Sequence, residues 1–155
     1  MEMVKGDLLQ MGRDGKFDII VHGCNCFNTM GSGIARQIRE QFPDAWLADQ
    51  ETLAGDRNKL HNYTIGMAGR LVIINAYTQY SFNKSGEAAD VFEYESFYAI
   101  LQKLNTRFGK YRFGFPMIGM GLAGGRQDVI LGMLQEFGKE VEAKGGSVTV
   151  VEYAP

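Results

Sequence analysis

Residues 18–35 read DIIVHGCNCFNTMGSGIA and pass from a strand through a loop into a helix. Their first part, Asp18 to His22, is a compact apolar run with β-branched side chains, which is typical of a strand buried on both faces. A polar, glycine-containing loop follows from Gly23 to Gly33. Helical spacing then appears, and Pro43 ends it because proline does not continue a helix without cost. The apolar residues at that spacing are Ile34, Ile38 and Phe42.

The same order of elements recurs near the end of the sequence. Arg112 to Ile118 is predicted to form a strand, and the run GMGLAGG from Gly119 to Gly125 leaves it as a loop. A last long helix is then indicated by Ile130, Leu134, Phe137 and Val141. The chain therefore contains two glycine-rich loops, each between a strand and a helix.

The remaining segments complete an α/β pattern. The predicted strands are Val4–Lys5, closed by Gly6-Asp7, the hairpin strands 62–67 and 71–77, and the valine-rich run 147–152. Helices are predicted over 44–53 and along the apolar stripe from Phe97 to Phe108, with a loop over 78–91. Strands that alternate with helices indicate a mostly parallel sheet covered on both faces, and the hairpin makes that sheet mixed. Because neither a repeat nor a linker is present, we predict one α/β domain over residues 1–155.

The composition is that of an ordinary globular protein and excludes several classes of function. Of the 155 residues, 45% are hydrophobic and 22% charged, and the net charge is −2. This charge gives no global attraction to nucleic acid, and no apolar stretch approaches the length of a membrane span. We therefore expect a cytoplasmic protein without a membrane or nucleic-acid partner.

The cysteines and histidines do not form a recognisable metal-binding pattern. Cys24 and Cys26 are the two cysteines, and His22 and His61 are the two histidines, with His61 distant in sequence. A zinc site needs a more complete set of ligands at regular spacing. We expect reduced thiols, no metal and no cofactor.

The two glycine-rich loops are predicted to lie at equivalent places. Ligands of open α/β sheets bind beyond the carboxyl ends of the parallel strands, and both loops leave such ends. Glycine lets the backbone approach a ligand closely, and the N-terminus of the following helix offers unpaired N–H groups that suit a phosphate. Either loop alone has the simpler interpretation of a turn, whereas the pair favours a ligand with two phosphates held from both sides.

Neither loop carries a standard nucleotide-binding motif. The sequence has no G-x-x-x-x-G-K-[ST], so it is not a P-loop kinase or ATPase. The run from Gly119 to Gly124 fits G-x-G-x-x-G, but it lies near the end of the chain and lacks the acidic residue expected after a second strand. A Rossmann dehydrogenase is therefore excluded.

These residues resemble the macrodomain family over nearly the whole chain. The segment Val21 to Ala35 resembles the first ligand loop of the branch that includes the yeast ADP-ribose 1″-phosphate phosphatase and phage macrodomain proteins. The run from Met117 to Gly124 is similar to the second loop, and the Gly6-Asp7 pair also fits. The resemblance implies a three-layer α/β/α fold with a central mixed, mostly parallel sheet, and it implies that ADP-ribose or ADP-ribose 1″-phosphate is the ligand. ADP-ribosylated macromolecules are further partners that it suggests.

The resemblance also implies a role for individual residues. Asp7 would accept a hydrogen bond from the adenine amino group, Leu8 would lie beside it, and Tyr153 would stack on adenine. Asn25 would bond the distal ribose. That ribose and one phosphate would be lined by Met30, Gly31, Ser32, Gly33 and Ile34. The diphosphate would be wrapped by Gly119, Met120, Gly121, Leu122, Ala123 and Gly124. The alternatives from the residues themselves are that Asp7 caps a helix, that Asn25 bonds its own loop and that Tyr153 only packs.

For chemistry, the resemblance favours hydrolysis of ADP-ribose 1″-phosphate to ADP-ribose and phosphate. His22 would transfer protons, Asn25 would orient the ribose, and Asp90 is an acidic candidate whose alternative is a helix cap. His22 has the alternative of bonding backbone at the strand end. Relatives that use a lysine nucleophile are less similar, because Lys84 is out of register and Ala123 stands where some of them carry aspartate. A non-catalytic reader of ADP-ribose and an ADP-ribosyl hydrolase stay open as alternatives.

Overall fold

The computed structural model describes residues 1–81, 91–121 and 123–154, and a six-stranded sheet forms its centre. The strand order is β1-β6-β5-β2-β4-β3. All neighbouring strands are parallel except the hairpin pair β3 and β4, so the predicted mixed, mostly parallel sheet is confirmed. The strands are β1 (Glu2–Gly6), β2 (Ile19–Cys24), β3 (Tyr63–Ala68), β4 (Leu71–Tyr77), β5 (Arg112–Phe115) and β6 (Ser147–Tyr153).

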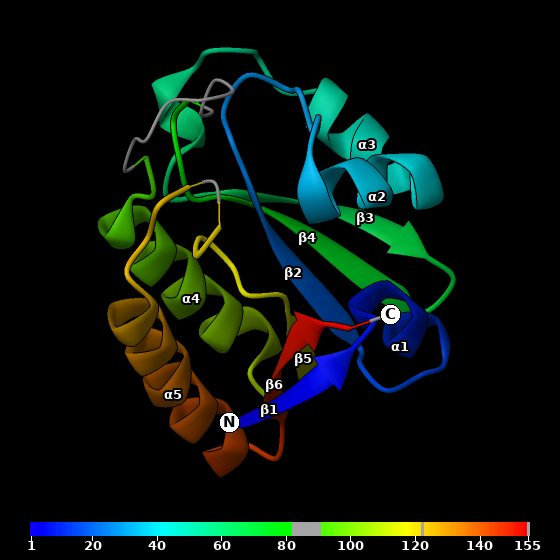
Figure 1. Ribbon diagram of the computed structural model, residues 1–155, viewed down its shortest axis with the longest axis vertical. Helices are drawn as coiled ribbons and strands as arrows, with labels where there is room; N and C mark the ends of the chain where they lie inside the picture. The colour runs from blue at the N-terminus through cyan, green and yellow to red at the C-terminus, as the bar shows by residue number, and fades with distance from the viewer. Residues whose placement is uncertain (82–90, 122, 155) are drawn as a thin grey trace.

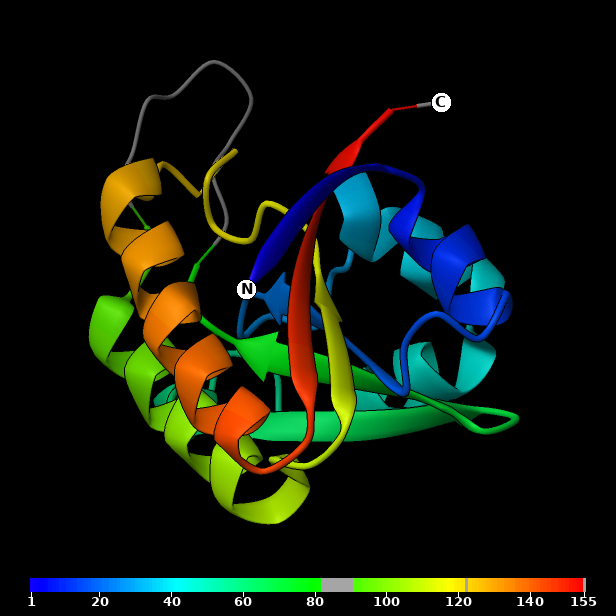
Figure 2. The same ribbon diagram turned by 90° about the horizontal axis from the view of Figure 1, so that it is seen from below.

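Helices cover both faces of this sheet. Figures 1 and 2 show α1, α2 and α3 on one face and α4 and α5 on the other, which confirms the predicted three-layer α/β/α fold. The helices are α1 (Leu8–Arg13), α2 (Gly33–Gln41), α3 (Pro43–Gln50), α4 (Tyr94–Phe108) and α5 (Gln127–Ala143), with a short 3-10 helix η1 (Arg57–Lys59). None of the helices in the described ranges is long and apolar enough to cross a membrane.

Strand β2 forms the middle of the core because its side chains are buried on both faces. Ile19 and Val21 belong to the cluster that packs under α4 and α5, whereas Ile20 belongs to the cluster under α1, α2 and α3. Each such side chain contributes about 1.5–3 kcal/mol by leaving water. The strand therefore fixes the position of the loop that leaves its end at Cys24.

Helix α1 and the ends of β5 and α3 differ from the prediction. No helix was predicted over Leu8–Arg13, but the alternative that Asp7 caps a helix is confirmed, because its Oδ1 accepts hydrogen bonds from the amides of Leu9 and Gln10. Strand β5 ends at Phe115 because Pro116 has no N–H to donate to the sheet. Helix α3 ends at Gln50 rather than at residue 53.

Candidate functional site

A cavity of about 370 Å³ opens at the carboxyl ends of β2 and β4. This is the end of the sheet where parallel α/β folds bind ligands. Both glycine-rich loops contribute to it, together with residues of α2 and α3. Its lining consists of Gly23, Cys24, Asn25, Thr29, Met30, Gly31, Ser32, Ala35, Asp49, Gln79 and Ala123.

The first loop is held in place by the side chain of Asn25. The Asn25 Oδ1 accepts a hydrogen bond of 2.8 Å from the Phe27 amide, and its Nδ2 donates one of 2.7 Å to Thr29 Oγ1. The Asn25 oxygen can accept one more hydrogen bond and its nitrogen can donate one more, because a side-chain amide carries two acceptor lone pairs and two N–H donors. Asn25 thus bonds its own loop, as the alternative interpretation held, and still lines the cavity.

The segment from residue 50 to residue 59 supports this loop from behind. Lys59, a buried lysine, donates from its Nζ to the Cys26 carbonyl at 3.1 Å and also to Asn28 Oδ1. The Asn28 Nδ2 donates to the Thr52 carbonyl at 2.8 Å. A buried ammonium needs hydrogen-bond acceptors to offset its lost hydration, and Cys26 and Asn28 supply them. The same bonds hold the first loop in place.

The loop contains unusual backbone angles where it turns into α2. Asn28 and Met30 have φ of 59° and 39°, and Gly33 has φ of 58°. Backbone strain of this kind in non-glycine residues clusters at ligand sites. Ser32 is the N-cap residue of α2 and makes no side-chain cap bond, which leaves the first N–H groups of the helix available to a ligand.

The second loop is closed by its own backbone. The Gly125 amide donates to the Gly119 carbonyl at 2.7 Å, and the Gly124 amide donates to the Gly121 carbonyl at 3.0 Å. The Ala123 carbonyl accepts from the amides of Val91 and Phe92, which ties the loop to the start of α4. Ala123 is the described residue of this loop that reaches the cavity.

The structure therefore brings together some of the predicted ligand residues and not others. Around the cavity it gathers Asn25, Met30, Gly31, Ser32 and Ala123. Within the described part of the chain, the cavity lining does not include Gly33, Ile34, Gly119, Met120, Gly121 and Gly124. The predicted residues Asp90 and Leu122, and the lysine Lys84, lie outside the described residues.

The residues predicted to hold adenine lie at the ends of β1 and β6, which are neighbouring strands. Gly6 is in register with Tyr153, whose side chain is 63% exposed, so the ring is available for stacking. Asp7 follows Gly6 and caps α1, as described above, and Leu8 is buried. Neither Asp7, Leu8 nor Tyr153 lines the 370 Å³ cavity.

The surroundings of His22 favour a structural role, and its role in proton transfer stays a prediction. The His22 side chain is completely buried and is absent from the cavity lining. Its Nε2 lies 2.6 Å from Asn75 Oδ1, and Asn75 in turn donates to the Ala45 carbonyl at 2.9 Å. Because the Asn75 oxygen is an acceptor, the Nε2 carries the proton and the ring is a neutral donor. His22 links β2 through β4 to α3.

Burial lowers the pKa of His22 to about 4 from 6.5, although the bond to Asn75 raises it. In the unfolded chain the ring takes up a proton near its ordinary pKa, whereas in the folded protein it does so only near pH 4. The free energy of unfolding should therefore fall as the pH drops below 6.5, by about 2 kcal/mol between pH 7 and pH 5 from this group.

Urea unfolding at several pH values tests this expectation. His22→Gln keeps an N–H donor for Asn75 but does not titrate. Its free energy of unfolding should therefore fall less between pH 7 and pH 5 than that of the wild type, by about 2 kcal/mol. Equal slopes in the wild type and in this variant would mean that His22 titrates normally and is not buried as described.

The two thiols near the cavity are unsuited to nucleophilic chemistry. Cys24 and Cys26 are free and buried, and burial raises the pKa of both, that of Cys26 to about 11. They are therefore protonated near neutral pH, and a thiol is a weak nucleophile. Among the described residues no group of three or more histidine, cysteine, aspartate or glutamate side chains is arranged to hold a metal ion.

Sequence reasoning missed six residues of the cavity: Gly23, Cys24, Thr29, Ala35, Asp49 and Gln79. Gly23, Cys24 and Thr29 lie within the predicted loop without having been assigned a ligand contact, and Ala35 lies two residues after it. Asp49 is different, because it comes from α3 and is buried with 1% exposure. Burial raises the pKa of Asp49, while the bond from Tyr77 and the charge of Lys59 lower it.

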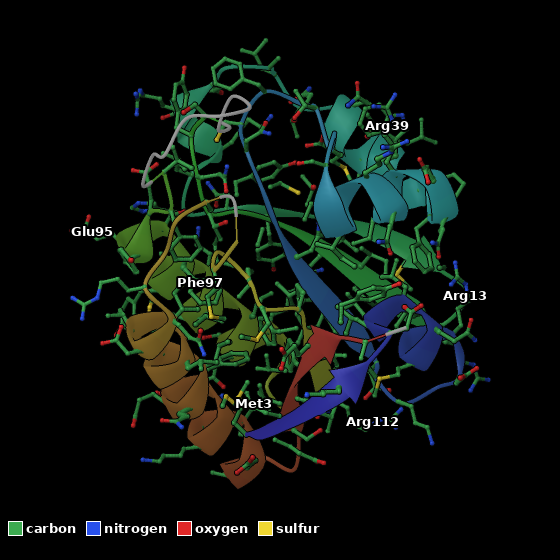
Figure 3. All side chains as sticks on the ribbon, in the orientation of Figure 1. Met3, Arg13, Arg39, Glu95, Phe97 and Arg112 are labelled. Carbon is green, nitrogen blue, oxygen red and sulfur yellow. The ribbon has the colours of Figure 1, made fainter. Side chains whose placement is uncertain are left out.

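A second hollow of about 540 Å³ lies at the other end of β2 and β4 and contains three arginines. Arg112 pairs with Asp18 at 2.9 Å, and Arg13 donates to Gln41 and covers the ring of Phe42. Figure 3 shows Arg13 and Arg112 on the α1 side of the molecule. Because these two guanidinium groups already have partners that join neighbouring segments, their arrangement is explained by packing.

Comparison with known sequences gives one informative relative. The chain is 32% identical to an uncharacterized 17.5 kDa protein from the tk-vs intergenic region of phage T4, over all of this chain and 97% of that protein. No protein-family model matches the chain.

Solved structures give a likeness of fold. A Bacteroides thetaiotaomicron protein of unknown function has a TM-score of 0.77 at 21% identity, covering 97% of this chain and 96% of the other. The macrodomain of Thermus aquaticus DarG has a TM-score of 0.69 at 21% identity over 99% and 97%. Thermosipho africanus DarTG in complex with ADP-ribose has a TM-score of 0.75 at 14% identity, covering 98% of this chain and 42% of that one.

Proposed function

Because the chain belongs to the same family as the 17.5 kDa phage T4 protein and has the macrodomain fold, we propose that it binds ADP-ribose between its two glycine-rich loops. The observation that carries the proposal is the cavity at the carboxyl ends of β2 and β4, beside the uncapped N-terminus of α2. Unpaired N–H groups and the partial positive charge of a helix N-terminus suit a diphosphate. The T. africanus neighbour, solved with ADP-ribose, supports this choice of ligand.

The ligand would lie with its distal ribose and one phosphate along the first loop. In this arrangement Asn25 bonds the ribose through its unused donor and acceptor, and residues 30–34 surround the ribose and the phosphate. The loop from Gly119 to Gly124 closes over the diphosphate. Asp7, Leu8 and Tyr153 receive adenine at the ends of β1 and β6, where the exposed Tyr153 ring offers a stacking surface.

Isothermal titration calorimetry tests binding directly. We expect ADP-ribose to bind in a one-to-one ratio and more tightly than ADP, because ADP lacks the distal ribose that Asn25 and its neighbours would contact. No heat of binding with ADP-ribose at concentrations up to the millimolar range would refute the proposal.

As the reaction of this site we propose hydrolysis of ADP-ribose 1″-phosphate, in which water cleaves the terminal phosphate to give ADP-ribose and inorganic phosphate. The likeness of residues 21–35 to the phosphatase branch supports it. Because His22 is buried and absent from the cavity lining, the proposal relies on Asn25 to orient the ribose and on the N–H groups of α2 to stabilise the phosphate charge.

Release of phosphate from ADP-ribose 1″-phosphate separates an enzyme from a reader. Asn25→Ala should lower the rate at least tenfold if Asn25 orients the substrate. Tight binding of ADP-ribose without phosphate release would instead leave a module that reads ADP-ribosyl groups on macromolecules. Removal of ADP-ribose from a modified macromolecule is the remaining alternative, and the same preparation can be assayed for it.

A further inference from the structure

The acidic group of the cavity is Asp49, one residue before the end of α3. Its side chain is 1% exposed, which is rare for an aspartate because a buried carboxylate loses its hydration. Figure 1 places α3 beside α2 and next to β3, on the same face of the sheet as α1 and α2. Asp49 therefore enters the cavity from a different element than the two glycine-rich loops.

Only half of this carboxylate has a hydrogen-bond partner. Asp49 Oδ1 accepts from the Tyr77 hydroxyl at 2.8 Å, and that hydroxyl lies 3.1 Å from Thr64 Oγ1. Asp49 Oδ2 is buried and has no hydrogen-bond partner in the structure. A buried polar atom without a partner costs free energy, and a bond from a ligand at the cavity would remove that cost for Asp49.

The nearest cation does not satisfy Asp49 either. Lys59 directs its ammonium to Cys26 and Asn28, and Asp49 takes part in none of the ion pairs found among the described residues. Asp49 thus keeps one oxygen without a hydrogen bond and forms no direct ion pair, although the charge of Lys59 and the Gln50 side chain lower its pKa. It lies at the wall of a cavity whose other polar side chains are neutral. Those neutral side chains are Asn25, Thr29, Ser32 and Gln79.

We propose that Asp49 is a specificity-determining residue that accepts a hydrogen bond from a hydroxyl of the distal ribose. The proposal rests on ADP-ribose being the ligand. A carboxylate attracts a hydroxyl donor and repels a phosphate, so it assigns the sugar to the α3 side of the cavity and the phosphates to the N-terminus of α2. Rotation about the Cβ–Cγ bond of aspartate is soft. Because it moves both oxygens together, the Tyr77 hydroxyl would follow Oδ1 as Oδ2 turns toward the ligand.

The test compares ADP-ribose with ADP, which shares everything except the distal ribose. Asp49→Asn should weaken ADP-ribose binding about tenfold, the cost of losing a charged acceptor, and should leave ADP binding unchanged. Tyr77→Phe is the matched control, because it disturbs the same network but keeps the carboxylate. We expect Tyr77→Phe to retain the preference for ADP-ribose.

Each outcome decides the proposal. The proposal would be overturned if Asp49→Asn lost affinity equally for ADP-ribose and ADP, or if it kept the wild-type preference for ADP-ribose. It would also be overturned if Tyr77→Phe lost that preference to the same extent. If Asp49→Asn does not fold, wild-type protein titrated with 2″-deoxy- and 3″-deoxy-ADP-ribose gives the answer, since at least one should bind about tenfold more weakly than ADP-ribose. Equal affinity for all three sugars would overturn the proposal, whereas failure of the wild type to bind ADP-ribose at all would refute the proposed function itself.

Discussion

Replacing Gly31 with glutamate is expected to weaken ADP-ribose binding about 100-fold while leaving the fold intact, because like charges placed together in a site cost several kcal/mol. Gly31 lines the cavity, and a Cβ built on it has the Thr29 carbonyl oxygen, at 3.9 Å, as its nearest non-adjacent neighbour. A side chain is therefore tolerated here without a clash. The new carboxylate would stand beside the position proposed for the diphosphate. Calorimetry with ADP-ribose measures the effect.

Gly31→Gln is the matched control for that variant, since it has nearly the same size and no charge. Its affinity for ADP-ribose should fall by no more than about tenfold, because the glutamine side chain only fills part of the cavity. Thermal unfolding should be nearly equal for both variants and the wild type. Wild-type affinity in Gly31→Glu would contradict the placement of the diphosphate at the first loop.

Replacing Gly66 with alanine is expected to destabilise the protein by about 3 kcal/mol, at the upper end of overpacking effects. Gly66 is buried in β3, and a Cβ there would overlap the backbone nitrogen and Cα of Ala45 in α3. Backbone atoms cannot move aside as a flexible side chain does, so α3 would have to separate from the sheet. Unfolding in guanidinium chloride measures the loss in the free energy of unfolding.

A glycine in a different setting provides the control for Gly66. Gly132 lies within α5, and a Cβ there has no neighbour within 4 Å. Gly132→Ala should therefore stabilise the protein by about 0.5–1 kcal/mol, because alanine has the higher helix propensity. Equal effects at the two positions would show that the contact between α3 and β3 is looser than described.

The fold was largely predictable because its periodicities are strong. The strand from Asp18 to His22 and the stripe from Phe97 to Phe108 are both found close to their predicted places, as β2 and α4. Helix α1 escaped prediction because its six residues, from Leu8 to Arg13, are too few to show a repeat. Asp7 was the available signal, since aspartate commonly caps a helix start.

The site was predictable only where it is local in sequence. The first loop could be read from its glycines and Asn25, which lie within a few residues of one another. The burial of His22 could not be predicted, because it depends on Asn75 and Ala45, which the sequence gives no reason to place beside it. Asp49 could not be predicted as a cavity residue, because an aspartate within a predicted helix is ordinarily exposed to solvent.

ADP-ribose is proposed to bind in the cavity formed by the first glycine-rich loop, Asp49 and Ala123. A titration of isotope-labelled protein with ADP-ribose, followed by two-dimensional NMR of the backbone amides, tests both the binding and its place. We expect the largest shifts on residues 23–35, Asp49, Gln79 and Ala123, with little change around the hollow that contains Arg13, Arg70 and Arg112. Shifts concentrated at that hollow, or no shifts at all, would contradict it.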